Sequence, residues 1–267
     1  MSLAGPPSEP AYACLETEIV FRGPARGTTA DRAGALRELR GHDSMHIGLI
    51  GGIGPAATDS YYRRLIAAFA ARQAELVMTI AHADTPTLVK NLSGNNRAAQ
   101  AAIFAGLTKR LVLAGADRVV VTSMGGHFCV DDFEAVSPLP VVNMIVEVGQ
   151  ALKQRGLKRI GILGTRTVME SRFYGALQFV EIIPPTGQDL DDVHEAYIAM
   201  AASGAVTDPQ RAVLNAVGRR LLRDHGAQAI MLGGTDLALV YDEATSEIPV
   251  IDCVSIHVDA VVRLALS

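Results

Sequence analysis

Tryptophan is absent from this sequence of 267 residues, and aromatic residues make up only 5% of it. Side chains on which bases or sugars stack are therefore scarce. The three cysteines, Cys14, Cys129 and Cys253, are too few and too scattered for a disulfide framework or a zinc site. No apolar run approaches the roughly 18 residues that a membrane-spanning helix needs. These absences predict a protein with no metal site and no membrane association.

Charge of one sign is also lacking. Lys and Arg (24) nearly balance Asp and Glu (28), and the formal net charge of -4 comes with no basic stripe, so nucleic acid is not an expected partner. The N-terminus has neither the basic start nor the apolar core of a secretory signal, and we expect a cytoplasmic protein. What is present, 49% hydrophobic and 19% charged residues, is typical of a compact enzyme or binding protein.

Three pairs of segments repeat along the chain at an offset of roughly 110 residues, which is about the size of a small domain. In each pair an apolar run ends in small or polar residues. The pairs are residues 47–52 with 160–165, 119–128 with 229–237, and 139–143 with 248–252. The sequence therefore predicts two copies of one α/β unit, with a site between them that is lined by matching loops.

The repeat also predicts the domain organisation. We expect a first α/β domain over residues 45–145 and a second over 146–254, with a C-terminal helix over 255–267 that packs back on the first. Residues 1–44 contain turn-forming Gly and Pro clusters and one short apolar stretch. They are predicted to be a loosely ordered extension, or the product of a start codon placed too early. The alternative is an arm that covers the site or docks on a partner.

From Met45 onward, short apolar runs alternate with helical periodicity, which predicts small, mainly parallel sheets flanked by helices. The predicted strands are 46–50, 75–81, 118–122, 141–144, 159–163, 178–183, 229–232 and 250–251. The predicted helices are 57–71, 96–114, 145–155, 167–176, 192–200, 209–224 and 256–265. In such sheets, sites form where loops leave the carboxyl ends of strands.

One such loop, residues 52–57 (GIGPAA), matches the G-x-G-x-x-A fingerprint of dinucleotide-binding proteins. That fingerprint needs an acidic residue about 20 positions further on to bind the ribose, and Asp84 lies roughly ten residues beyond this point. We therefore favour a different role for the loop. Gly52 and Ile53 are expected to offer backbone N–H groups to a small anion, such as a carboxylate, at a helix N-terminus.

Longer motifs of mixed residue type extend from about Met45 to the C-terminus. They are residues 47–55 with 61–63, 114–117, 161–170 with 173–174, 232–237, and 248–252 with 256–257. Together these motifs resemble the aspartate/glutamate racemase superfamily, the cofactor-independent amino-acid racemases. The segment 161–170 (GILGTRTVME) is the most specific of them.

The resemblance implies two pseudo-symmetric α/β domains with the active site in the cleft between them, and a homodimer. It implies a small amino acid or dicarboxylic acid as substrate and no cofactor. A proton is removed from one face of the α-carbon and another is delivered to the opposite face. Because that proton is weakly acidic, the reaction needs a base and an acid on opposite faces, and cysteine suits both roles since its pKa is tunable.

The first of the two cysteine motifs differs in this chain. In the family it reads Cys-Asn-Thr-x-His, or begins with Thr in the broad-specificity branch. Aligned on His127, this chain has Ser123, Met124 and Gly125. A serine hydroxyl is a weak base unless a neighbour activates it, and the Asn and Thr that are expected to bind the carboxylate are missing.

The second cysteine motif differs as well. It reads Gly-Cys-Thr-Glu in the family, whereas here Gly234 stands at the cysteine position, before Thr235 and Asp236. Glycine has no side-chain proton to give. Racemisation by two thiols is therefore not expected.

The candidate catalytic residues occupy or adjoin the two cysteine positions: Ser123, Gly234, His127 and Asp236. Each has a structural alternative. Ser123 fits as a small residue at a tight strand end, and His127 as a helix cap or a core residue. Asp236 fits as a carboxylate in the first turn of a helix, where it interacts favourably with the helix dipole. The candidate substrate-binding residues are Gly52, Ile53, Met124, Gly125, Thr165 and Thr235. For the two threonines, the alternative role is stabilisation of a turn.

Three other residues are expected to be structural. Cys129, six residues after Ser123, is predicted to be a small buried hydrophobe rather than a displaced nucleophile. Asp252 and His257, near the end of the second unit, are predicted to form structural hydrogen bonds.

Three functions stay open at this point. The first is a racemase-like enzyme that uses groups other than thiols. The second is a decarboxylase, isomerase or lyase of a small carboxylic acid on the same scaffold; relatives that decarboxylate malonates use one cysteine. The third is a non-catalytic protein that binds an amino acid or dicarboxylate.

Overall fold

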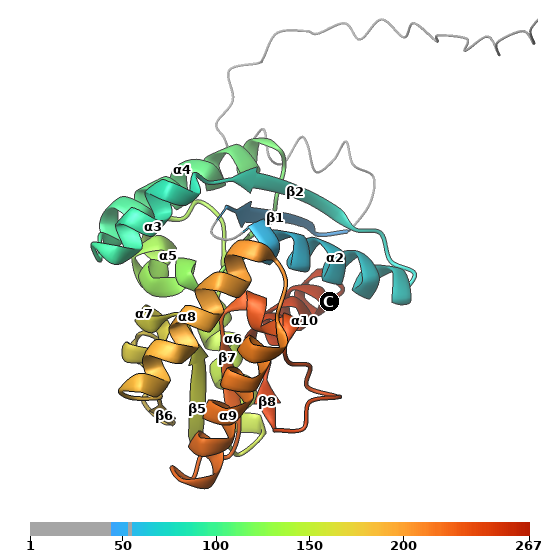
Figure 1. Cartoon of the computed structure of the whole chain (residues 1–267). Helices are drawn as coiled ribbons and strands as arrows, with labels where there is room; N and C mark the ends of the chain where they lie inside the picture. The colour runs from blue at the N-terminus through green and yellow to red at the C-terminus, as the bar shows by residue number, and fades with distance from the viewer. Residues whose placement is uncertain (1–43, 53–54) are drawn as a thin grey trace, which may run out of the picture.

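The computed structural model describes residues 44–52 and 55–267. It contains two four-stranded parallel sheets, one in each half of the chain, with helices packed around both (Figure 1). In the described ranges, no helix is long and apolar enough to cross a membrane. The predictions for residues 1–43 and for Ile53 lie outside the described residues.

The first sheet has the order β2-β1-β3-β4, and neighbouring strands are parallel throughout. Its strands are β1 His46–Gly51, β2 Val77–His82, β3 Arg118–Val121 and β4 Val141–Val142. Every residue of β1 is buried, as are the three valines of β3, which is typical of a parallel sheet covered on both faces. The helices of this half are α2 Pro55–Ala71, α3 Thr85–Ser93, α4 Arg97–Leu113 and α5 Val130–Val136.

The second sheet has the order β6-β5-β7-β8, again with all neighbours parallel. Its strands are β5 Arg159–Gly164, β6 Glu181–Ile183, β7 Ile230–Gly233 and β8 Val250–Ile251. Its helices are α7 Arg166–Glu170, α8 Gln188–Ser203 and α9 Asp208–Arg223. Strand for strand, this is the order of the first sheet. The predicted duplication of one parallel α/β unit is therefore confirmed.

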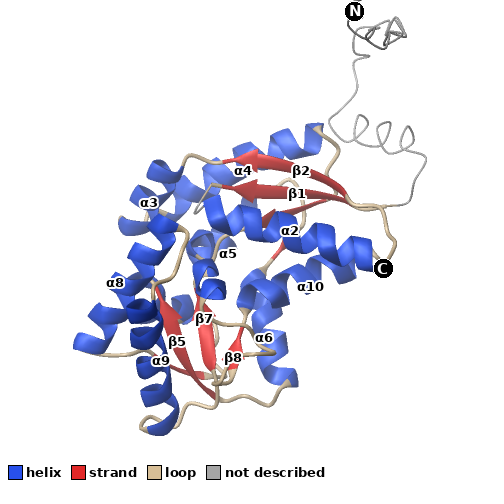
Figure 2. Cartoon of the chain, turned by 45° about the vertical axis from the view of Figure 1, so that its right-hand side comes forward, coloured by secondary structure: helices blue, strands red, loops and turns tan. Residues whose placement is uncertain are grey.

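A helix follows the fourth strand of each unit: α6 Met144–Gln154 and α10 Cys253–Ala265. The residue before each helix caps it, because the side chains of Asn143 and Asp252 accept hydrogen bonds from backbone N–H groups of the first turn. The repeated motif of an apolar run with a polar end is thus a strand followed by a helix cap. Helix α10 packs against both α6 and α2, the latter in the first half (Figure 2).

The two halves share one core. A single cluster of buried apolar side chains includes Ile47 of β1, Ile162 of β5 and Val261 of α10. A second cluster lies around α4 and contains Phe104 and Phe133, whose ring centroids are 5.3 Å apart. The apolar core is therefore continuous from one half of the chain into the other.

All eight predicted strands are present, but the predicted continuous helix over residues 167–176 is wrong beyond Glu170. Helix α7 ends there, and the next residues have positive φ angles: 50° at Arg172, 58° at Phe173, 60° at Tyr174 and 65° at Gly175. They form a left-handed turn that includes the 3-10 segment η2, Phe173–Gly175. Helical periodicity gives no information on this reversal, because it records which side chains are buried and not the sign of φ.

Helix α3 was missed by the sequence prediction. It has nine residues, with Asp84 as its N-cap and a proline in its first turn. Only Leu88 and Asn91 of this helix are buried, so its apolar periodicity is weak. A short helix of this kind is predicted from its cap rather than from its pattern.

Candidate functional site

The candidate site lies where loops leave the central strands of both sheets. In the first half, β3 is followed by Thr122, Ser123 and the 3-10 segment η1, Gly125–Cys129. In the second half, β7 is followed by Gly234 and the 3-10 segment η3, Thr235–Leu239. Segment η3 contacts α2 of the first half. The second loop therefore lies at the junction of the two halves.

A tyrosine of the second half bonds the first loop directly. The Tyr174 hydroxyl, from the left-handed turn, donates to the carbonyl oxygen of Met124 at 3.3 Å. Burial raises the pKa of Tyr174, so the hydroxyl stays protonated at neutral pH. The turn after α7 thus holds the first loop in place from the second half.

The end of β3 is fixed by hydroxyl groups. Thr122 is fully buried; its Oγ1 donates to the Ile50 carbonyl oxygen at 3.2 Å and lies 3.1 Å from the Thr58 Oγ1 of α2. These bonds join the ends of β1 and β3 to the start of α2. Ser123 is also buried, with 6% of its surface exposed, and its Oγ makes no hydrogen bond to any residue that the structure describes.

His127 has a structural environment. Its Nδ1–H donates to the carbonyl oxygen of Ser123 at 2.7 Å, and its Nε2 accepts from the Met144 N–H at 3.4 Å. Burial lowers the pKa of His127 to about 4, so the ring is neutral near pH 7. Both nitrogens are occupied, and the bond to residue 123 is to its backbone rather than its hydroxyl. Of the two roles considered for His127, the geometry favours the structural one.

His257 has a similar environment. Its Nε2–H donates to the Val142 carbonyl oxygen at 2.8 Å, and its Nδ1 accepts from the Tyr61 hydroxyl at 2.7 Å. Burial, and then the nearby His127 ring, lower the pKa of His257 to about 3. The two imidazole centroids are 5.7 Å apart. His257 therefore joins α10 to α2 and to the end of β4.

Gly234 is a glycine because of its surroundings. Its φ of -167° is ordinary extended backbone, so its conformation does not require glycine. A Cβ at this position, however, would lie 2.4 Å from the hydroxyl oxygen of Tyr197 and 2.5 Å from two carbons of its ring. The phenol of Tyr197, from α8, occupies the space that any side chain at position 234 would need.

Tyr197 is paired with Asp236. The tyrosine is 6% exposed, and its hydroxyl donates to Asp236 Oδ2 at 2.9 Å. Burial, followed by the charge and the hydrogen bond of Asp236, raises the pKa of Tyr197 well above its usual value. Tyr197 was not among the residues predicted for the site. Its position on the buried face of a predicted helix indicated only that it belonged to the core.

Gly52 lets the first glycine loop touch the β2–α3 connection. Its φ is +116°, and a Cβ there would lie 1.9 Å from the carbonyl oxygen of Ala83. The Thr85 hydroxyl donates to the Gly52 carbonyl oxygen. Asp84 caps α3, accepting from the N–H of Thr87 at 3.0 Å and from its hydroxyl at 2.6 Å. Packing and capping therefore account for the glycine and the acidic residue of the dinucleotide fingerprint.

The remaining predicted binding residues are partly exposed at the same strand ends. Thr165 caps α7, where its Oγ1 accepts from the Val168 N–H at 3.4 Å, which leaves its hydroxyl hydrogen available to donate. Gly125 and Thr235 begin η1 and η3. Met124, by contrast, is 3% exposed.

The described cysteines are buried away from solvent. Burial raises the pKa of Cys129 to about 12 and that of Cys253 well above the usual thiol value. Neither thiol ionises near neutral pH, so neither replaces the absent nucleophiles. In the described residues, no group of three or more His, Cys, Asp or Glu side chains is placed to hold a metal ion.

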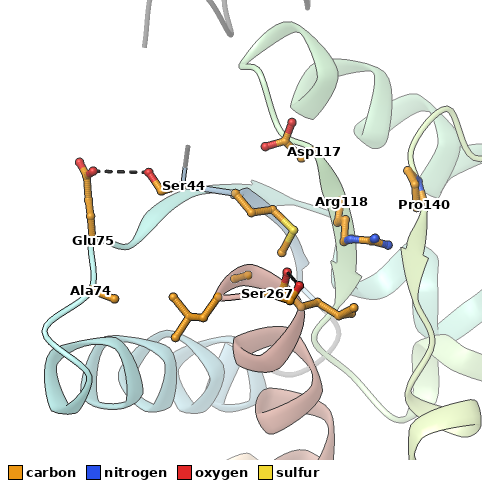
Figure 3. A pocket seen from close by; sticks show the side chains of 11 residues that line it. Ser44, Ala74, Glu75, Asp117, Arg118, Pro140 and Ser267 are labelled. Carbon is orange, nitrogen blue, oxygen red and sulfur yellow. Dashed lines mark hydrogen bonds between the residues drawn. The ribbon is translucent and has the colours of Figure 1, made fainter. Parts of the chain in front are cut away.

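A separate cavity of about 580 Å³ lies at the other end of the first sheet (Figure 3). Asp117 and Arg118, at the start of β3, and Ser267 line it. Active sites of open parallel sheets lie at the carboxyl ends of strands, whereas this cavity lies at the amino ends. It is therefore not part of the candidate site.

The fold and site define a class of protein: a duplicated α/β molecule whose matching strand-end loops lie at the junction of its halves. The chain belongs to the Asp/Glu/hydantoin racemase family, whose model matches residues 50–261. Family membership confirms the resemblance found in the sequence and indicates an isomerase.

Solved structures share the fold. A Yersinia pestis protein described as a proposed Asp/Glu racemase is 26% identical in sequence to this chain. The match covers 84% of this chain and 100% of that chain, with a TM-score of 0.74. An aspartate racemase homologue from Pyrococcus horikoshii OT3 is 23% identical, with 83% and 99% covered and a TM-score of 0.72. A liganded double mutant of arylmalonate decarboxylase is 18% identical, with 83% and 93% covered and a TM-score of 0.51.

Proposed function

We propose that this chain binds a small amino acid or dicarboxylic acid between the two strand-end loops and transfers a proton at its α-carbon without a cofactor. One observation carries the proposal: in a chain of the racemase family, the first loop is bonded from the second half, where Tyr174 donates to the Met124 carbonyl oxygen, and the second loop contacts α2 of the first half. A substrate at that junction contacts both units.

Binding is assigned to short donors at the strand ends. Thr165 and Thr235 are partly exposed residues that each carry a hydroxyl, and Gly52 and Gly125 contribute backbone N–H groups toward a carboxylate. Such donors suit an anion because several N–H and O–H groups share its charge. Met124 contributes through its backbone, since its side chain is buried.

The catalytic assignment differs from that of a two-thiol racemase. Ser123 offers a hydroxyl with no activating base, because His127 bonds the backbone of residue 123 instead. Gly234 offers nothing itself, while Asp236 and its partner Tyr197 lie beside it. Proton transfer is therefore assigned to the second loop, with Ser123 as a hydrogen-bond donor to the substrate.

The test is α-hydrogen exchange in D₂O. Aspartate, glutamate and a panel of other amino acids and dicarboxylates are incubated with the protein, and the α-proton signal is followed by NMR. We expect loss of that signal for at least one acid. If no acid exchanges while a dicarboxylate raises the melting temperature, the chain is a binding protein and the proposal fails.

A matched pair of variants tests the binding assignment. Thr235→Val should weaken binding of the acid about tenfold or more, because a hydrogen bond to a charged group is lost. Thr245→Val removes a hydroxyl that bonds Asp242 in an exposed turn and should leave binding unchanged. Calorimetric titration measures both; equal affinities for the two variants would remove Thr235 from the site.

Decarboxylation is the second candidate function. It needs a proton donor on only one face, and Asp236 of the second loop forms a titratable pair with Tyr197 of α8 beside the family's second cysteine position. The arylmalonate decarboxylase mutant shares the fold. Release of CO₂ from substituted malonates, without exchange of amino acids, would favour this function over racemisation.

A further inference from the structure

We propose that Tyr197, held by Asp236, is the proton-transfer group on the Gly234 side of the substrate, and that the site works from this face alone. This inference rests on the proposed function and deepens it. It assigns a role to a residue that lies outside both family motifs, on helix α8. It also predicts the stereochemical course of the reaction.

The first step is position. The Tyr197 oxygen lies 2.4 Å from where a Cβ at position 234 would stand, so it lies close to the place that a short side chain of residue 234 would reach. A side chain at position 234 and the Tyr197 phenol would occupy the same space, so this position of the phenol requires glycine at 234. One polar hydrogen-bonding group therefore takes the place of another on this side of the site.

The second step is the hydrogen bond. Asp236 Oδ2 accepts a hydrogen bond from the Tyr197 hydroxyl, with an oxygen–oxygen distance of 2.9 Å. This bond fixes the orientation of the hydroxyl and leaves a lone pair of its oxygen free to take a further proton. The other titratable group that acts on Tyr197 is Tyr174 of the left-handed turn, which raises the pKa of Tyr197 slightly further. Asp236 is therefore the residue that orients Tyr197 and the acceptor of its proton.

The third step is the chemistry. The α-carbon–hydrogen bond breaks, its electron pair stays on the substrate and delocalises into the carboxyl group, and the proton goes to the Tyr197 oxygen. In the same step the original Tyr197 proton passes to Asp236, so that Asp236 ends as a carboxylic acid. No phenolate forms, which agrees with a buried tyrosine whose pKa is raised. The reverse transfer returns a proton to the same face.

On the opposite face, the described residues supply no equivalent group. Ser123 presents a hydroxyl that makes no hydrogen bond within the described part of the chain, and His127 is occupied by backbone groups. A carbanion in the site therefore regains its proton from the side that lost it. The expected outcome is exchange of the α-hydrogen with retention of configuration, or stereospecific protonation after loss of CO₂.

The experiment follows exchange and configuration together. A single enantiomer of the exchanging acid is incubated in D₂O with the native chain, Tyr197→Phe, Asp236→Asn and the control Tyr241→Phe. Tyr241 is a buried tyrosine of the same half whose hydroxyl has no partner among the described residues. NMR gives the exchange rate, chiral chromatography gives the configuration, and circular dichroism with calorimetric titration checks folding and binding.

We expect the native chain and Tyr241→Phe to exchange with retention. Tyr197→Phe, which keeps the ring, should fold and bind but exchange at least about 100-fold more slowly. Asp236→Asn, which has no carboxylate to accept the Tyr197 proton, should also exchange at least about 100-fold more slowly. Racemisation as fast as exchange would overturn the one-sided site and leave the proposed function standing. Undiminished exchange by Tyr197→Phe would overturn the role of Tyr197. No exchange of any acid by the native chain would overturn the proposed function itself.

Discussion

At the scale of single residues, the most informative pair is Gly234 and Tyr197. The sequence located the two strand-end loops and showed that Gly234 stands at a cysteine position, because those facts depend on local motifs. It did not indicate Tyr197, which is 39 residues from its partner Asp236 and reaches the loop only through the packing of α8. A pairing of this kind depends on tertiary contacts and has no local signal in one sequence.

The complementarity of this pair predicts a stability coupling. Gly234→Ala alone should lower the free energy of unfolding by about 1–3 kcal/mol, because its Cβ overlaps the phenol. Tyr197→Ala alone should lower it by about 3–5 kcal/mol through the cavity that it leaves. In the double variant the methyl group enters that cavity, and the loss should be at least about 1 kcal/mol smaller than the sum. Urea denaturation measures all four chains.

Strict additivity would mean that Tyr197 does not fill the space beside position 234. The same geometry bears on any attempt to restore two thiols. Ser123→Cys with Gly234→Cys should be destabilised as long as Tyr197 is present, and the addition of Tyr197→Ala should relieve it.

The buried histidines predict how stability depends on pH. An unfolded histidine titrates near 6.5, whereas the pKa values of folded His127 and His257 are lowered to about 4 and about 3. Below about pH 6.5 the unfolded chain binds more protons, so stability falls as the pH falls from 6.5 toward the folded values. Each histidine should cost about 2 kcal/mol between pH 6.5 and pH 5.

His127→Gln checks this effect. This variant should be less stable than the native chain at pH 7.5. As the pH is lowered, however, its free energy of unfolding should decrease less steeply than that of the native chain, by about 1.4 kcal/mol per pH unit. The exposed His225, changed to Gln, serves as the control for replacement of a surface histidine. Urea denaturation from pH 5 to pH 7.5 gives the slopes; identical slopes for His127→Gln and the native chain would contradict the assignment.

At the scale of elements, local signals predicted most of the fold. Buried parallel strands are short continuous apolar runs, and all eight were visible in the sequence for that reason. The elements that the sequence did not predict are short or irregular. They are helix α3, which has two buried residues, and the turn after α7. In that turn Phe173 is fully buried and Tyr174 bonds Met124, so tertiary contacts stabilise a conformation that the residues themselves disfavour.

This turn predicts a stabilising substitution. Arg172 is exposed and has a φ of 50°, a conformation that costs a residue with a Cβ about 1–2 kcal/mol. Arg172→Gly should raise the free energy of unfolding by about 0.5–1 kcal/mol. The gain is smaller than the relieved strain because glycine also increases the conformational entropy of the unfolded chain. Arg172→Ala keeps the Cβ and should change little. Urea denaturation that found Gly no more stable than Ala would show that this turn is not left-handed.

At the scale of the whole molecule, the two units are joined by helices as well as by loops. The α2 residue Arg64 bonds Asp252 at 2.9 Å and Ser255, at the start of α10, and Arg263 of α10 pairs with Glu147 of α6 at 2.9 Å. With the shared apolar cluster, these contacts make the junction part of the core. The site at that junction is therefore formed only in the fully folded chain, and homodimerisation stays a prediction.

The shared core predicts that both units unfold in one transition. Because the sequence has no tryptophan, a single tryptophan reports on one half only. Tyr62 of α2 and Phe179 of the second half, each 43% exposed, are matched sites for Tyr62→Trp and Phe179→Trp. Since the larger buried cluster extends through both halves, we expect the unfolding of one half to expose apolar side chains of the other. Both fluorescence signals should therefore change at the same urea concentration, and at the midpoint of the far-ultraviolet circular dichroism. Separate midpoints would mean that each unit folds independently and that the two folded units then pack against each other.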